Sequence, residues 1–297
     1  MDFNMFMQHF INAIGLGSLY GLIAIGYTMV YGILRLINFA HGDIFMLGAY
    51  FIFFATISHG LPWAVGAMIA IVGATFCGLL VDRIAYRPLR NAPRISALIS
   101  AIGVSFFIEN FTVVVFSGMP RPVVQPAALM APITIGSVRL VPLALMVPAI
   151  AFILVAALLW MLYGTKPGLA MRAISYDIET TRLMGVSVDK IIALTFAIGS
   201  ALAAVAGILW ALRYPRVEPF MGIMPGFKAF IAAVFGGIGS VPGAMIGGIV
   251  LGFVEIMSVA FFPTLSGYRD AFAFLLLVVI LLWKPTGLMG GKLEDKI

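Results

Sequence analysis

The chain has 297 residues, of which 62% are hydrophobic and only 10% are charged. Because a soluble domain carries roughly 25% charged residues, this composition excludes a water-soluble fold. The net charge of +6 lies in connectors between apolar blocks and forms no basic helix face or long basic tail. It therefore predicts membrane orientation and no nucleic-acid partner.

Eight apolar blocks follow one another, most of them near the length of about 20 residues that crosses a hydrocarbon core. They comprise residues 10–34, 44–58, 62–81, 96–116, 140–163, 191–212, 241–262 and 271–283. The sequence predicts an all-α, polytopic membrane helical bundle with about eight spans (seven to nine), forming a single transmembrane domain over residues 1–297. Residues 226–240 are also apolar but short and rich in glycine, so they are expected to form either a re-entrant half-helix or a further crossing.

Basic residues concentrate in the connectors at residues 83–94 and 164–190 and in the tail from residue 284, which predicts that these regions are cytoplasmic. Tracing the blocks from these anchors puts the amino terminus outside and the carboxyl terminus inside, which requires an odd number of crossings. Eight blocks conflict with this requirement, so residues 226–240 cross, one block does not cross, or the first connector is oriented the other way. The connector at residues 117–139 contains four prolines and is expected to be an extended external loop.

Five polar residues are candidates for lining a solute pathway. Asn38, His41 and Asp43 lie in a polar, glycine-containing break between apolar blocks, and broken helices can present backbone groups to a solute at membrane depth. The alternative is a tight turn in which Asp43 caps the next helix. Glu109 and Glu255 interrupt apolar blocks, where a carboxyl group indicates a functional site, although packing between helices through a protonated carboxyl explains them equally well.

The connector at residues 164–190 is too polar to span a membrane and is patterned like a pair of helices. Ala170, Ala173 and Ile174 repeat at helical spacing, and a second apolar repeat follows, so two short helices separated near Asp177 are expected. Amphipathic helices between two spans are suited to binding a soluble partner. The alternative is a solvated loop that lies on the lipid headgroups.

The same connector resembles the EAA loop of ABC importer permeases, because a glutamate, two small residues and, four positions later, a glycine occur at that motif's spacing. The two alanines of the motif are threonines here, and the Ile-x-Leu-Pro element that follows it is absent. The resemblance implies that residues 164–190 form a cytoplasmic coupling loop that transmits force from an ATPase. The residues assigned to coupling are Ala170, Arg172, Glu179, Thr180, Thr181 and Gly185.

Two longer stretches, "GLIAIGYTMVYGILRLINFAHGDIFMLGAY" at residues 21–50 and "AFIAAVFGGIGSVPGAMIGGIVLG" at residues 229–252, resemble signatures of branched-chain amino acid permeases of the LivH type. The resemblance implies an ABC importer in the bacterial inner membrane that moves leucine, isoleucine and valine, with urea or short amides as the alternative solutes. It also implies a second homologous permease subunit, two ATP-binding subunits and a periplasmic amino-acid-binding protein.

The sequence indicates a pore-forming subunit rather than an enzyme. It contains no G-x-x-x-x-G-K-[ST] phosphate loop, so ATP is expected to be bound and hydrolysed by partner subunits, with no cofactor on this chain. Its three histidines lie far apart in the sequence, and no metal site is expected. The rival hypothesis is a gradient-driven secondary transporter that needs no soluble partner and uses Glu109 or Glu255 as its proton or cation site.

Overall fold

The computed structural model describes residues 3–90, 92–135 and 138–290 of the chain. Among these residues, nine α-helices of 13 residues or more form the bundle: α1 (Phe3–Leu34), α2 (His41–Phe53), α3 (Trp63–Val81), α4 (Arg94–Phe116), α6 (Pro142–Gly164), α9 (Val188–Arg213), α10 (Ile223–Gly236), α11 (Val241–Phe261) and α12 (Arg269–Trp283). All eight predicted spans are confirmed, because eight helical segments are long and apolar enough to cross a membrane.

The remaining elements are short or lie outside the bundle. The helical ones are η1 (Phe54–Ser58), η2 (Asp82–Tyr86), η3 (Arg87–Leu89), α5 (Ala127–Met130), α7 (Lys166–Tyr176), α8 (Ile178–Leu183) and η4 (Pro263–Tyr268). The strands are β1 (Arg121–Pro122), β2 (Ile133–Ile135), β3 (Val138–Leu140) and β4 (Arg216–Val217). Helix η4 continues into α12, so that the last span comprises both elements.

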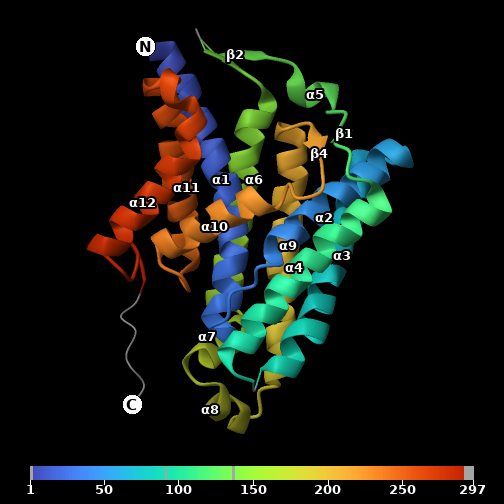
Figure 1. Cartoon of the computed structure of the whole chain (residues 1–297), viewed down its shortest axis with the longest axis vertical. Coiled ribbons are helices and arrows are strands. Elements are labelled where there is room, and N and C mark those ends of the chain that lie inside the picture. Colours follow the sequence, from blue (N-terminus) through green and yellow to red (C-terminus); the bar gives the residue numbers. More distant parts are fainter. Residues whose placement is uncertain (1–2, 91, 136–137, 291–297) are drawn as a thin grey trace.

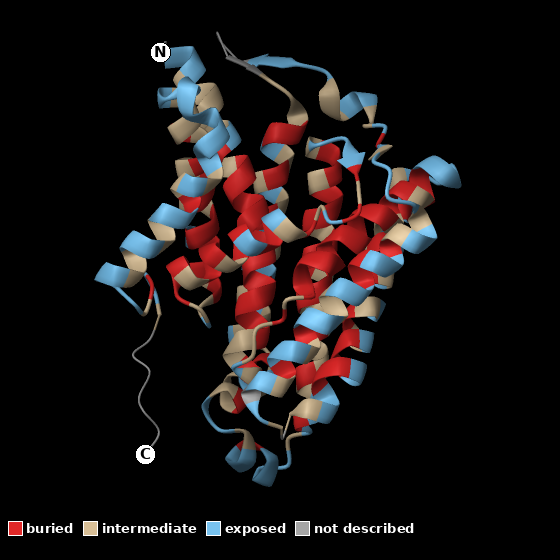
Figure 2. Ribbon diagram, viewed as in Figure 1, coloured by how far each residue is buried: buried red, intermediate tan, exposed pale blue. Residues whose placement is uncertain are grey.

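Helix α1 lies at the centre of the bundle and contacts α9, α10, α11 and α6 (Figure 1). In its most apolar stretch 94% of the residues are buried, compared with 6% in the η4–α12 span. Buried residues gather on the central helices, whereas exposed residues are common along α3, α4 and α12 (Figure 2). A helix that is apolar on all sides belongs in the interior of a bundle, and the exposed apolar side chains of the outer helices form the surface available to lipid or to another membrane subunit.

Glycines let α1 and α11 approach one another closely. Gly17 and Gly21 of α1 face Gly248 and Gly252 of α11, and a methyl group added to Gly17 would lie 2.5 Å from the Cα atom of Ile249. Small residues at such contacts favour helix packing inside membranes, where burial of apolar surface provides no driving force between helices. This close contact fixes α11 against the central helix.

The break between α1 and α2 brings the start of α2 into the interior. After Leu34 the chain turns back, and α2 begins near the middle of the bundle (Figure 1). His41, Gly42 and Asp43 are all buried there, and Gly42 packs against Gly222 at the start of α10. The predicted polar break therefore interrupts the helices in the buried interior of the bundle.

Residues 214–240 form a crossing that is partly extended and partly helical. Strand β4 pairs with β1, which lies in the loop after α4. The other end of the segment reaches the tail of the described chain, because Leu288 N donates to Phe235 O at 2.9 Å and Met289 N donates to Gly236 O at 2.8 Å.

The 14 residues of α10 span about 21 Å at 1.5 Å per residue, which is less than a hydrocarbon core of roughly 30 Å. A turn at residues 219–222 connects β4 to α10. Together with the eight apolar segments, this segment gives an odd number of passages among the described residues, as the first of the three explanations requires. Helix α10 begins three residues earlier and ends four residues earlier than the predicted 226–240 segment.

The loop at residues 117–139 is more ordered than predicted. It contains α5 and three short strands, with β1 antiparallel to β4 and β2 antiparallel to β3. Proline is tolerated at strand edges because it only removes a donor, so the prolines that exclude a long helix still allow these two small sheets. Val123 N also donates to Pro215 O at 3.0 Å, which fastens the loop to the segment after α9.

Candidate functional site

Helices α7 and α8 form a hairpin that projects from one end of the bundle (Figure 1). The two helices are separated at Asp177, as the sequence predicts. Asp177 Oδ1 accepts hydrogen bonds from the backbone N–H groups of Glu179 at 2.9 Å and Thr180 at 3.2 Å. An aspartate in this position satisfies the otherwise unpaired donors at a helix start, which explains why a new helix begins directly after the break.

Gly185 closes the other end of α8. Its backbone N–H donates to Arg182 O at 3.0 Å and the next N–H, of Val186, donates to Thr181 O at 3.4 Å. This pair of bonds is the Schellman arrangement, in which the residue after the helix adopts a left-handed conformation. The φ angle of Gly185 is +82°, a conformation that glycine adopts without steric cost. This backbone geometry explains why glycine occupies that position of the EAA-like motif.

The residues assigned to coupling divide into an outward and an inward group. Glu179, Thr180 and Gly185 are exposed, and Ala170 is half-buried. Arg172 and Thr181 instead contact their own chain. The Arg172 guanidinium lies 5.1 Å from the centre of the Tyr163 ring on α6, and the Thr181 hydroxyl donates to Asp177 O at 2.6 Å. Arg172 thus connects α7 to α6, and Thr181 bonds within its own helix.

The apolar side chains of the hairpin end are left uncovered. Leu183 is 87% exposed and Met184 is 80% exposed, whereas Met171 and Ile174 on α7 are buried against the bundle. The hairpin is therefore amphipathic in the predicted sense, with one apolar face packed inward and a second apolar patch facing outward. Exposed apolar residues rimmed by polar ones are typical of a protein contact.

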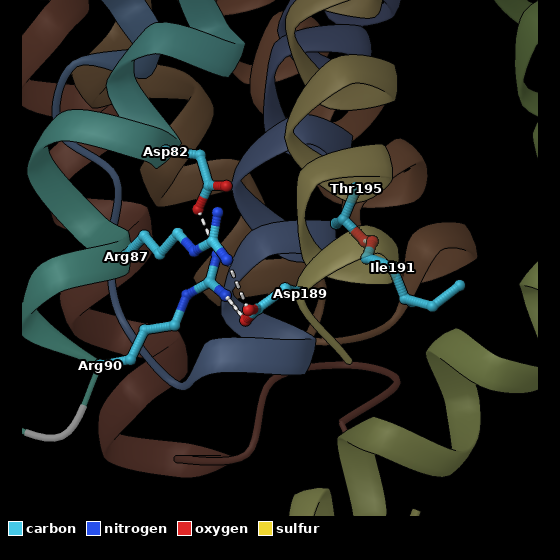
Figure 3. Close-up of polar contacts among 6 residues, drawn as sticks. All are labelled: Asp82, Arg87, Arg90, Asp189, Ile191 and Thr195. Carbon is cyan, nitrogen blue, oxygen red and sulfur yellow. Dashed lines mark hydrogen bonds and ion pairs between the residues drawn. The ribbon is translucent and has the colours of Figure 1, made fainter. Parts of the chain in front are cut away.

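A network of ion pairs connects the end of α3 to the start of α9 beside this hairpin (Figure 3). Arg90 donates to Asp82 Oδ1 at 2.6 Å and to Asp189 Oδ1 at 2.5 Å. Arg87 donates to Asp189 Oδ2 at 2.8 Å. Asp82 is nearly inaccessible, whereas Arg87 and Asp189 are half-exposed. Arg90 therefore connects a buried carboxylate to one at the surface.

Further along α9, the Thr195 hydroxyl donates to the backbone carbonyl of Ile191 at 2.9 Å (Figure 3).

This network was not predicted from the sequence. The basic residues were used there only to orient the chain, and Asp189 was not singled out. Sequence spacing gives no signal that residues about 100 positions apart form a pair. Because Asp189 lies in the first turn of the helix that follows α8, the network links the hairpin to the α3 end of the bundle.

Asp43 and Glu109, two of the five pathway candidates, line one cavity of about 250 Å³ between α1, α2, α4 and α10. The Ser105 hydroxyl donates to Asp43 Oδ2 at 2.5 Å. The alternative that Asp43 caps α2 is wrong, because Ala40 occupies the cap position and no side chain caps the helix. Most of the other side chains around this cavity are apolar.

Asn38 and His41 lie near this cavity without lining it. Tyr86 OH donates to Asn38 Oδ1 at 3.1 Å, and the His41 ring packs edge-on against Tyr27, with 4.8 Å between ring centres. Both residues are buried. Their observed contacts are those of packing residues within the break.

Glu255 lies in a different part of the bundle, in a cluster of charges. Its Oε1 is 2.9 Å from Lys228 Nζ, and its Oε2 accepts a hydrogen bond from Tyr20 OH at 2.9 Å. Lys228 Nζ is also 2.6 Å from Asp270 Oδ1, and Arg269 Nε is 3.4 Å from Glu255 Oε1. The side chains of Lys228 and Glu255 are only 4% and 3% exposed. Glu255 on α11 therefore contacts α10 through Lys228, α12 through Arg269 and α1 through the hydrogen bond from Tyr20.

Lys228 is a functional candidate that sequence analysis missed. It is a single cation within an apolar helix of 14 residues, and an ionisable side chain inside a membrane segment indicates a functional site. The rule that selected Glu255 would have selected Lys228 as well. The cluster opens on a cavity of about 550 Å³.

Comparison with known proteins agrees with these features. The family model described as "Branched-chain amino acid transport system / permease component" matches residues 9–281. The chain is 42% identical to the high-affinity branched-chain amino acid transport system permease protein LivH of Escherichia coli (strain K12), over 100% of this chain and 99% of that protein. It is 39% identical to BraD of Pseudomonas aeruginosa, a permease protein of the same description, over 98% of each chain.

A more distant likeness is to a sugar permease. It is 27% identical to the ribose import permease protein RbsC of Escherichia coli (strain K12) over 64% of this chain and 61% of that protein. The family match and the eight apolar spans identify a multi-pass membrane permease. The chain belongs to the family of branched-chain amino acid transport system permease components.

Proposed function

We propose that this chain is the permease subunit of an ABC importer that moves leucine, isoleucine and valine across the bacterial inner membrane. The observation that carries the proposal is the 42% identity to LivH along the full length of both chains. The likeness to the ribose permease is weaker and covers about two thirds of this chain. The two likenesses together therefore favour amino acids over sugars as the solute.

The proposed assembly contains a second homologous permease, two ATP-binding subunits and a periplasmic amino-acid-binding protein. ATP is bound and hydrolysed by the ATP-binding subunits, and this chain needs no cofactor of its own. The α7–α8 hairpin is the proposed docking element, because Leu183 and Met184 form an exposed apolar patch next to the exposed Glu179 and Thr180. Amphipathic helices bind partners by inserting such residues into a groove.

The proposed mechanism is a rigid-body alternation of helix bundles around a pathway at the interface of the two permeases. Closure of the ATP-binding subunits pushes on the hairpin. Arg90 and Asp189 then transfer this displacement to α3 and α9, because their short ion pairs connect the two helices beside the hairpin. The capped ends of α8 keep the hairpin rigid enough to move as one piece.

Affinity purification from the native membrane in mild detergent, followed by uptake in proteoliposomes, tests this function. We expect a second permease and two ATP-binding subunits to co-purify, and we expect leucine uptake that requires both ATP and the binding protein. Leucine, urea and acetamide are compared as solutes, since transport of the amides alone would assign the chain to a different substrate class. Ion-gradient-driven uptake by the purified chain alone would replace the importer by a secondary transporter.

A further inference from the structure

We propose that the cavity beside the Lys228–Glu255 pair is a transit site that holds the ammonium and carboxylate groups of a zwitterionic amino acid during its passage. This inference rests on the proposed function and names where within this chain the solute is held. The cavity measures about 550 Å³, within the range of roughly 300–1,000 Å³ that is typical of small-molecule sites.

The charges that line the cavity balance. Lys228, Arg216 and Arg269 supply three cations, and Glu218, Glu255 and Asp270 supply three carboxylates. A site for a cation requires an excess of carboxylates, and a site for an anion requires an excess of cations. A balanced site that contains both signs matches a solute that carries one ammonium and one carboxylate on the same carbon.

The six charged residues comprise a buried pair, Lys228 and Glu255, and a more exposed group that includes Arg269. Lys228 and Glu255 are almost fully buried and paired with each other, so they keep the site neutral when it holds no solute. Arg269 is 57% exposed, and its Nε lies 3.4 Å from Glu255 and 3.6 Å from Asp270. Both distances exceed a normal hydrogen bond, so this guanidinium retains donors for a bidentate carboxylate.

Asp270 is the matching acceptor for an ammonium group. It is partly exposed at the cavity and adjacent in sequence to Arg269, and its Oδ1 lies 2.6 Å from Lys228 Nζ. The two residues begin α12, so opposite charges stand side by side on one helix end. A solute whose ammonium meets Asp270 therefore has its carboxylate within reach of Arg269.

The remaining lining suits a branched apolar side chain. Trp210 and Tyr214 contact one another, with 4.7 Å between ring centres, and both line the cavity together with Met221 and Met224. Methionine adapts its shape to different apolar groups, which accommodates leucine, isoleucine and valine in one site. Met224 also lies in the first turn of α10, where the helix dipole favours a negative group.

The second cavity does not offer this chemistry. Asp43 and Glu109 line it, but no lysine or arginine does among the described residues. Such a cavity suits a cation rather than a zwitterion. We therefore expect the amino acid to occupy the cavity beside Lys228 and Glu255 rather than the one beside Asp43 and Glu109.

A substitution that fills the larger cavity without disturbing the buried ion pair gives the first test. Met224→Trp is compared with Met68→Trp, since Met68 is an exposed methionine on the outer helix α3. In the reconstituted complex of both permeases, the ATP-binding subunits and the binding protein, we expect leucine uptake to fall at least tenfold for Met224→Trp and to stay unchanged for Met68→Trp. Co-elution of the subunits on gel filtration shows that each variant assembles.

Thiol protection gives a second test that does not depend on the effect of a bulky side chain. Cys77 is the only cysteine of the chain, so Met224→Cys in a Cys77→Ala background carries one reporter thiol in the cavity, and Met119→Cys carries one in the exposed loop after α4. Under turnover with ATP, binding protein and leucine, we expect maleimide labelling at position 224 to slow several-fold and labelling at position 119 to be unaffected.

The outcomes separate the transit site from the proposed function. Normal leucine uptake by Met224→Trp, or unprotected labelling at position 224 while the complex transports leucine, overturns the transit site and leaves the importer intact. Failure of the unsubstituted complex to transport any branched-chain amino acid overturns the proposed function instead. Reduced uptake together with leucine-dependent protection supports the site.

Discussion

Gly185 ends α8 with a φ angle of +82° and has open space around the position of a Cβ atom. Replacing it by alanine therefore adds backbone strain of about 1 kcal/mol without any clash. We expect Gly185→Ala to shift the end of the hairpin and to lower leucine uptake per ATP hydrolysed by at least threefold in proteoliposomes. Gly60→Ala is the matched control, since Gly60 has a φ angle of +64° and open space but lies between η1 and α3.

If both glycine variants lower the coupling ratio equally, general loss of stability explains the effect and the hairpin has no special role.

Glu179→Lys tests the same surface through its charge. Because Glu179 is exposed, we expect this variant to fold normally and to uncouple ATP hydrolysis from uptake. Normal coupled uptake by both Glu179→Lys and Gly185→Ala contradicts the coupling assignment.

Arg90 is the residue of the ion-pair network whose loss costs most stability. Its removal leaves Asp82, which is 5% exposed, as a buried carboxylate without its cation, and breaking a buried pair costs roughly 3–5 kcal/mol. Removing half-exposed Arg87 costs about 1 kcal/mol or less, because a surface ion pair contributes little. We expect Arg90→Gln to lower the melting temperature in detergent clearly more than Arg87→Gln, as followed by tryptophan fluorescence. Equal melting temperatures for the two variants would contradict the bridging role of Arg90.

Among the helices, the contact of α1 with α11 depends on the absence of side chains. A methyl group on Gly248 would clash with the backbone N–H of Gly21, and overpacking a tight interior contact costs about 1–3 kcal/mol. Gly103 lies on α4, and a methyl group there would meet nothing within 4 Å. We expect Gly248→Ala to reduce the yield of folded protein and its melting temperature, whereas Gly103→Ala is neutral or slightly stabilising because alanine favours the helix. A neutral Gly248→Ala would show that α11 can move away from α1 at no cost.

A helix can be predicted here where its own residues form a long apolar run or a clear helical pattern. All eight spans follow from the length of apolar runs, and the break at Asp177 follows from a local change of pattern. Whether residues 226–240 cross does not follow from their sequence, because the 14 residues of α10 are too few to span a membrane as a helix. The small sheets do not follow from the sequence, because each strand has only two or three residues and β1 pairs with β4, which is far away in the sequence.

The candidate site was predictable only one residue at a time. Asp43, Glu109 and Glu255 stood out as carboxylates in apolar surroundings, but the sequence could not show that Asp43 and Glu109 line one cavity while Glu255 pairs with Lys228 in another. Those groupings depend on contacts between α2 and α4 and between α10 and α11. Tertiary packing decides which charges meet, and no spacing rule reports it.

For the complete chain, the single span α6 between them predicts that the loop after α4 and the α7–α8 hairpin face opposite sides of the membrane. Met119 and Met184 are well exposed, one in each region, so each can be changed to cysteine in a Cys77→Ala background. In intact spheroplasts we expect a membrane-impermeant maleimide to label position 119 directly and position 184 only after permeabilisation. Labelling of both from the same side would contradict the crossing by α6, and labelling with the two sides exchanged would reverse the orientation.

The short α10 helix with its buried lysine also has a consequence for biosynthesis. A helix of 14 residues that carries Lys228 is too short and too costly to enter the bilayer by itself. Its neutralising partner, Glu255, is made 27 residues later on α11. We therefore expect the ribosome to deliver α10 and α11 to the insertion machinery as one hairpin, with α10 remaining at the membrane surface until Glu255 has been synthesised.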